Sequence, residues 1–248
     1  MITPLYGSLT PMGRSYGTAV AAFSPASVSG LIAWYKSDSG SGLYQASSGT
    51  GSLAAANGDP VGFWTDQSGT RNATQSTSGA KPTLATAALN GLPVVRFTTS
   101  TYMSFSSVAL SGAWTLYIVG NSIAGQNFAL GGPTNGYIGY YNSGGSYVVD
   151  DVNFSPNYPG NATTRSVVIR AHRSGAGANV GYKTTGVSEL SQSSTLGTIT
   201  ISEIMRRASP AIACAGDVGE VILYNTDLST TDKSSVEAYI LSKWGVAT

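Results

Sequence analysis

The sequence has a single cysteine and a single histidine in 248 residues, Cys214 and His172. One cysteine excludes an internal disulfide framework and a zinc site built from several thiolates. One histidine leaves a serine-hydrolase triad with a single possible base. Because Arg170 and Arg173 flank His172 in the sequence, we expect a surface histidine rather than a catalytic one.

Charge is also scarce. Charged residues make up 10% of the chain and nearly cancel, to a net +1. Nucleic-acid binding depends on clustered Lys or Arg, and Arg206-Arg207 is the only tight pair. No apolar run approaches the ~20 residues of a membrane-spanning helix, and the chain does not open with a basic segment followed by an apolar one. We therefore expect no nucleic-acid partner, no membrane contact and no ordinary secretory signal.

What the sequence does have is period-2 alternation. Leu31, Ala33 and Tyr35 alternate with the residues between them, and the pattern recurs over 114–119 and 167–172. In the last stretch, alternation predicts that the charged side chains of Arg170 and His172 lie on the outer face. Turn-forming dipeptides such as Asn90-Gly91 separate these stretches. Because 42% of the residues are apolar, there is enough material for a large core. Many short strands with Gly-rich turns predict an all-β, antiparallel two-sheet sandwich.

One helix is expected, close to the C-terminus. Ser229 is a good N-cap, with Asp232 three residues later in a variant of the capping box. An apolar face follows at helical spacing, with Val236, Tyr239, Ile240 and Trp244. Gly245 then provides a C-cap.

Residues 1–27 have no clear period and contain several Pro and Gly residues, so we predict an extended N-terminal arm. Its larger apolar side chains are candidates for docking on a partner: Leu5, Tyr6, Leu9 and Tyr16. The remaining residues, 28–248, are predicted to form one domain.

Four stretches carry a family resemblance. They are 30–38 (GLIAWYKSD), 59–75 (with FWTDQSG), 81–97 (KPTL to LNGLPVVRF) and 219–245 (GEVILYN, the helix and KWG). In this order they resemble the laminin-G-like branch of the concanavalin A-like lectin/glucanase superfamily, which occurs in phage structural proteins and bacterial surface proteins. The resemblance implies a jelly roll of two curved antiparallel sheets packed face to face.

The glucanases of that superfamily carry a Glu-x-Asp-x-x-Glu run on one strand, and this sequence lacks it. Its glutamates are isolated from one another: Glu189, Glu203, Glu220 and Glu237. We therefore predict that the chain is not an enzyme. A pair of carboxylates that folding brings together, about 5–9 Å apart, is the alternative left open.

Sugar binding is the activity that the residues favour, because lectin sites combine an aromatic platform with groups that hydrogen-bond hydroxyls. The densest such mixture supplies the candidate glycan platform, Tyr137, Tyr140, Tyr141, Asn142 and Tyr147. No cofactor is expected. Calcium is the one metal left open, since relatives in the superfamily bind it, and its candidate oxygen ligands are Asp150, Asp151 and Asn153.

The sequence prediction for function is a phage virion structural protein: a capsid decoration, head fibre or tail-associated jelly roll, assembled in the host cytoplasm. Its arm would dock on other virion proteins or identical subunits, and its domain would bind host-surface glycans. The first alternative is a carbohydrate-binding module of a bacterial surface or secreted protein, which would be extracellular. The second is a glycoside hydrolase without the usual motif.

Overall fold

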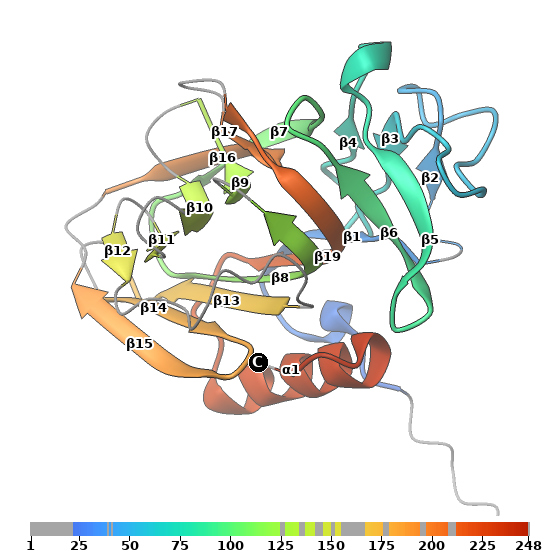
Figure 1. Ribbon diagram of the computed structural model, residues 1–248. Helices are drawn as coiled ribbons and strands as arrows, with labels where there is room; N and C mark the ends of the chain where they lie inside the picture. The colour runs from blue at the N-terminus through green and yellow to red at the C-terminus, as the bar shows by residue number, and fades with distance from the viewer. Residues whose placement is uncertain are drawn as a thin grey trace, which may run out of the picture.

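A computed structural model describes most of the chain. The described residues are 22–38, 40, 42–124, 127–133, 137–141, 146–149, 152–154, 167–175, 179–193, 197–207 and 212–247. They form two large antiparallel sheets and one α-helix (Figure 1). The predicted all-β, antiparallel sandwich is thereby confirmed.

Sheet A has eight strands in the order β15-β14-β13-β8-β19-β6-β5, with β1 also paired to β19. The strands are β1 (Leu31–Lys36), β5 (Thr83–Leu89), β6 (Leu92–Phe97), β8 (Trp114–Ala124), β13 (Val167–Arg173), β14 (Asn179–Thr184), β15 (Val187–Ser193) and β19 (Ala215–Tyr224). Strand β6 pairs with β19 at 216–218 and β1 pairs with it at 220–224. Thus β1 and β6 follow one another along one edge of β19.

Sheet B has nine strands in the order β12-β11-β10-β9-β16-β7-β4-β3-β2. The strands are β2 (Leu43–Tyr44), β3 (Phe63–Trp64), β4 (Ala73–Thr74), β7 (Met103–Leu110), β9 (Asn127–Gly131), β10 (Tyr137–Tyr141), β11 (Ser146–Val149), β12 (Val152–Phe154) and β16 (Ile199–Ile204). The smaller elements are a hairpin of β17 (Arg206–Arg207) and β18 (Ile212–Ala213), and two 3-10 turns, η1 (Pro25–Ser27) and η2 (Ser78–Ala80).

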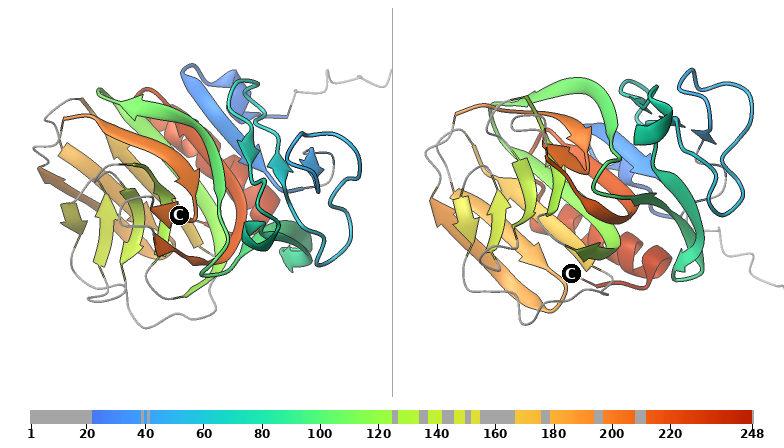
Figure 2. Two further views of the ribbon diagram at one scale, coloured as in Figure 1. Left: turned by 90° about the horizontal axis from the view of Figure 1, so that it is seen from above. Right: turned by 45° about the horizontal axis from the view of Figure 1, so that its top comes forward.

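Side-chain alternation divides the interior into two cores. Ala33 and Tyr35 of β1 belong to the core between the sheets, together with Trp64 and Phe105 of sheet B. Trp34, the residue between them, points the other way, into a second core shared with the helix α1. The molecule therefore has three layers, with sheet A between sheet B and α1 (Figures 1 and 2).

Helix α1 (Thr230–Trp244) begins and ends as predicted. The Ser229 hydroxyl accepts a hydrogen bond from the Asp232 amide at 3.1 Å, and Gly245 adopts a left-handed φ of 67°. Residues at helical spacing are buried against sheet A: Val236, Ile240 and Trp244. Tyr239, which was assigned to the same apolar face, is only partly buried and packs its ring against Phe23.

The prediction of charged side chains on an open outer face of β13 is wrong, because α1 and neighbouring strands cover that face. Arg170 is buried and forms ion pairs with Glu189 and Glu237. His172 Nε2 lies 2.6 Å from Glu189 Oε1, and Nδ1 lies 3.0 Å from Asp227 Oδ1. The spatial neighbours of the histidine are thus carboxylates as well as the arginines that flank it in sequence.

The predicted arm is described only from Ala22 onward, where it forms η1. Its candidate docking residues, Leu5, Tyr6, Leu9 and Tyr16, lie outside the described residues. Among the described residues, no helix combines the length and apolarity that crossing a bilayer requires.

Candidate functional site

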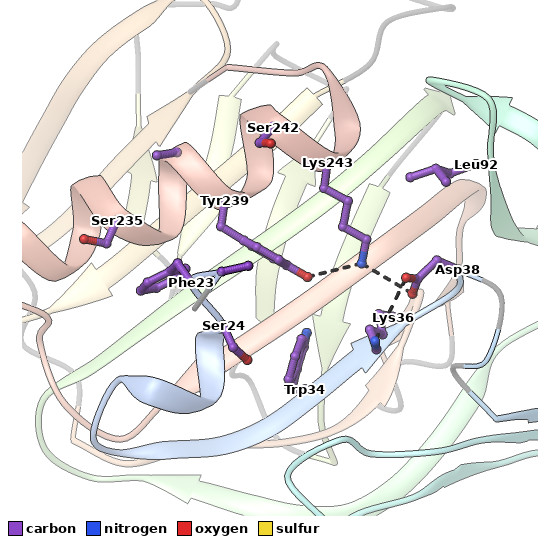
Figure 3. Close-up of a pocket in the computed structure, with 12 residues that line it drawn as sticks. Phe23, Ser24, Trp34, Lys36, Asp38, Leu92, Ser235, Tyr239, Ser242 and Lys243 are labelled. Atoms are coloured by element: carbon purple, nitrogen blue, oxygen red, sulfur yellow. Dashed lines mark hydrogen bonds and ion pairs between the residues drawn. The ribbon is translucent and has the colours of Figure 1, made fainter. Parts of the chain in front are cut away.

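A groove of about 730 Å³ lies between α1, β1 and the segment that leads into η1 (Figure 3). It is lined by three aromatic side chains, three charged ones and three serines, and small or apolar residues complete its wall: Phe23, Trp34, Tyr239, Lys36, Asp38, Lys243, Ser24, Ser235, Ser242, Ala22, Leu92 and Ala238. We call it the α1–β1 groove.

The periodicity of two elements brings these side chains together. Trp34 and Lys36 are two residues apart on β1 and therefore share the face of the strand that looks toward α1. Ser235, Tyr239 and Ser242 recur at intervals of four and three residues, so they lie along one side of the helix. The groove is formed where this side of α1 meets the end of β1.

A fully buried carboxylate, Glu220 of β19, lies beneath the groove. Its Oε1 accepts hydrogen bonds from Trp34 Nε1 at 2.5 Å and Tyr239 Oη at 2.9 Å. Its Oε2 accepts from Lys243 Nζ at 3.1 Å and Trp244 Nε1 at 2.6 Å. With four donors the buried charge is compensated, and Glu220 fixes the orientation of three groove side chains.

Tyr239 is a hydroxyl donor in this network. Burial, and then the negative charge of Glu220, raise the pKa of Tyr239 above its ordinary value. The phenol therefore stays neutral and keeps the proton that it donates to Glu220.

Lys243 connects the buried carboxylate to one at the mouth of the groove. Its Nζ lies 3.3 Å from Asp38 Oδ1 and 3.2 Å from Tyr239 Oη (Figure 3). Lys36 Nζ approaches Asp38 Oδ2 at 4.0 Å, and these two side chains are 24% and 23% exposed. Asp38 and Lys36 are therefore the charged groups that a ligand in the groove can reach.

This arrangement suits a hydroxyl-rich ligand with apolar faces. Partly buried rings, here Phe23 and Tyr239, offer apolar contact area. A few convergent polar groups then fix orientation and provide specificity, and Asp38, Lys36 and Ser242 supply an acceptor, a donor and a hydroxyl.

The predicted glycan platform falls partly on described backbone. Tyr137, Tyr140 and Tyr141 lie in β10 and Tyr147 lies in β11, and the register pairs Tyr140 with Tyr147. Asn142 lies outside the described residues, and for the four tyrosines the structure describes the backbone but not the side chains. The platform stays a prediction.

The candidate calcium ligands are also only partly described. Asn153 lies in β12, whereas Asp150 and Asp151 lie outside the described residues. In the part of the chain that the structure describes, no group of three or more His, Cys, Asp or Glu side chains is arranged to hold a metal.

Sequence reasoning missed the groove because its parts are far apart in the chain. Glu220 looked like one of four isolated glutamates, and Asp38 lay in a polar loop. The sequence feature that could have pointed to the groove was Trp34. Alternation along β1 places its side chain on the face opposite to Ala33 and Tyr35, and α1 covers that face.

Sheet B carries a second carboxyl in an unusual environment. Glu203 of β16 is 9% exposed, and its Oε2 has no direct hydrogen bond among the described residues. Burial raises the pKa of Glu203, and the charge of Arg206, 3.5 Å away, counteracts this only in part. The Arg206 guanidinium in turn lies 4.0 Å from the centroid of the Tyr102 ring.

Solved structures share this fold, although no protein-family model and no curated protein sequence matches the chain. An arabinofuranosidase complexed with arabinofuranosyl-alpha-1,2-xylobiose matches with a TM-score of 0.55 and 13% identity, over 76% of this chain and 52% of its own. A GH54 α-L-arabinofuranosidase soaked with a cyclic sulfate inhibitor matches at 0.54 and 15%, over 75% and 51%. This chain thus spans about half the length of these proteins.

A third match covers a whole domain. Domain 4 of a GH43 extracellular arabinanase from Geobacillus stearothermophilus, in complex with arabinotriose, has a TM-score of 0.52 and 10% identity. The match covers 82% of this chain and 96% of that domain. At such identities the likeness establishes a common β-sandwich fold.

The comparisons contradict the prediction that the chain is not an enzyme, because glycoside hydrolases are among the proteins that share its fold. The prediction relied on the missing Glu-x-Asp-x-x-Glu run. That run is one way to place carboxylates on one strand, and its absence says nothing of carboxyl groups such as Glu203 that separate strands contribute.

Proposed function

We propose that this chain is a carbohydrate-recognition domain that binds a short pentose oligosaccharide in the α1–β1 groove. The observation that carries the proposal is the match over nearly the full length of an arabinanase domain that was solved with arabinotriose. The groove supports it independently, since it combines aromatic side chains with Asp38, Lys36 and Ser242 at its mouth.

Preorganisation also favours ligand binding here. Glu220 holds Trp34, Tyr239 and Lys243 through direct hydrogen bonds before any ligand arrives. Side chains that are already ordered lose little conformational freedom on binding, so less affinity is lost to ordering.

The test is isothermal titration calorimetry with arabinotriose. We expect the wild-type chain to bind it and Ser242→Trp, which fills the groove, to weaken binding at least tenfold. The matched control is Ser234→Trp, on the exposed side of the same helix and outside the groove, and it should bind as the wild type does. Absence of binding to the wild type, or equal binding by Ser242→Trp, would contradict the proposal.

A second candidate function is glycoside hydrolysis with Glu203 as the acid. Catalytic acids of this class have a raised pKa, as Glu203 does. Hydrolysis also needs a second carboxyl group near the acid. Among the described residues, the one charged group that changes the pKa of Glu203 is Arg206, so this candidate has no identified second carboxylate. Release of arabinose from arabinan by the wild type, but not by Glu203→Gln, would support this candidate.

The finer assignments from the sequence remain proposals. The four quoted stretches favour a concanavalin A-like jelly roll of the laminin-G-like branch, with an arm over residues 1–27. A virion location, with docking through that arm, is a prediction from that resemblance alone. The carbohydrate-binding module, its first alternative, agrees better with the arabinanase domain.

A further inference from the structure

A second hollow, of about 450 Å³, meets the α1–β1 groove at Asp38, which lines both. The strand β6 separates them: Leu92 lines the groove and Pro93, the next residue, lines the second hollow. Consecutive residues of a strand point to opposite faces. The two hollows therefore lie on opposite faces of sheet A and adjoin beside the end of β1.

The second hollow differs from the groove in chemistry. Its floor is formed by aliphatic side chains of the main core, Leu43, Ala54 and Leu84. Ser37 is buried and its hydroxyl is already used, because its one proton lies between two acceptors, the carbonyl oxygens of Pro93 and Gly219, 2.7 and 2.9 Å from Oγ. Apart from Asp38 at the junction, none of the described residues that line it is charged.

Two features of its rim point to an occupant. Leu53 is 54% exposed at the mouth, an unusual exposure for a leucine that already lines a hollow. Ala87, also in the lining, has a left-handed φ of 52°. Such a conformation is unfavourable for a residue with a Cβ, and strain of this kind gathers at ligand sites.

We propose that the second hollow holds an apolar substituent, an aryl or acyl group, attached to the sugar whose hydroxyl-rich part occupies the α1–β1 groove. This rests on the proposed function and narrows its ligand to a substituted oligosaccharide. Among the described lining residues, the only polar side chains are Ser37, Asp38 and Thr86, and the floor is aliphatic. Such a hollow favours an apolar group over another sugar ring, most of whose hydroxyls would lose their water there. Asp38, at the junction, contacts the sugar next to the substituent.

The experiment compares arabinotriose with its 4-nitrophenyl glycoside by calorimetry. The variant is Ala55→Phe, which fills the mouth of the second hollow. The matched control is Ala56→Phe: both alanines are exposed and both amides donate to Asp59 Oδ2, at 2.9 and 2.8 Å, but only Ala55 lines the hollow.

We expect the wild type and Ala56→Phe to bind the 4-nitrophenyl glycoside about tenfold more tightly than arabinotriose, because the second hollow would bury part of the apolar surface of the nitrophenyl ring. Ala55→Phe should bind both ligands with the affinity of arabinotriose. Equal affinities in the wild type, or a gain that survives in Ala55→Phe, overturn the inference and leave the proposed function intact. If neither ligand binds to the wild type, both fail.

Discussion

At the residue scale, the buried charge of Glu220 is the strongest single determinant of the groove. Removing it leaves two indole N–H groups, a phenol and an ammonium without their shared acceptor. Glu220→Ala should therefore lower the free energy of unfolding by about 3–5 kcal/mol in urea titrations. Glu203→Ala is the control, because among the described residues its Oε2 accepts no direct hydrogen bond and has only a partly exposed ion pair with Arg206; it should cost less than about 1 kcal/mol. Equal losses would mean that burial alone matters.

Ala87 is a second residue whose backbone can be tested. Glycine accepts a left-handed φ without the Cβ penalty, so Ala87→Gly should raise the free energy of unfolding by about 0.5–1 kcal/mol. Ala85→Gly, two residues earlier in the same strand and not in that conformation, should lower it by a similar amount. A loss in both variants would show that no strain is relieved at Ala87.

The raised pKa of Glu203 predicts a pH dependence. Because the folded chain holds this proton more tightly than the unfolded chain, the group favours folding at acidic pH. Its contribution is lost as the pH rises from about 4.3, the ordinary glutamate value, through the raised pKa. Glu203→Gln, measured by urea titration against the wild type, should gain relative stability between about pH 4 and pH 7. A constant difference across this range would contradict the assignment.

At the element scale, α1 shows how far local signals reach. Its caps and its buried side were all predictable, because Ser229, Gly245 and the spacing of Val236, Ile240 and Trp244 act within a few residues. Ser229→Ala should cost about 1 kcal/mol of unfolding free energy. Ser234→Ala, exposed within the helix, should leave it unchanged or slightly increased. Thermal and urea unfolding both report this difference.

The strands show what local sequence patterns cannot predict. Alternation correctly assigned Ala33 and Tyr35 to one side of β1 and Trp34 to the other. It could not reveal that α1 covers the second side, so Arg170 was predicted to be exposed and is buried in ion pairs. Pairing between strands distant in sequence, as of β1 with β19, is decided by tertiary packing that no local pattern encodes.

At the scale of the whole molecule, the cores formed by the described residues extend from Phe23 to Val246. Because the sequence predicts that residues 1–21 belong to an extended arm outside the domain, deleting them should leave the melting temperature within about 2 °C of the wild type. If Leu5, Tyr6, Leu9 and Tyr16 dock on identical subunits, as the sequence predicts, light scattering should show that the deletion abolishes self-association. Unchanged association would contradict the docking role of the arm.

The two-sheet architecture followed from the sequence, whereas the proposed binding site did not. The α1–β1 groove takes side chains from four separate segments, around Phe23, Asp38, Leu92 and Tyr239, that only the three-layer packing brings together. The tyrosine-rich stretch in β10 and β11 drew attention because its residues are neighbours in sequence. The β10–β11 stretch is therefore the alternative site for a bound sugar.

Chemical-shift mapping of the ¹⁵N-labelled chain with arabinotriose separates these places most directly. A sugar in the α1–β1 groove should shift the indole N–H signal of Trp34 and the amide signals of Asp38, Tyr239 and Ser242. Shifts confined to Tyr137–Tyr141 and Tyr147, or no shifts at millimolar ligand, would contradict binding in the groove.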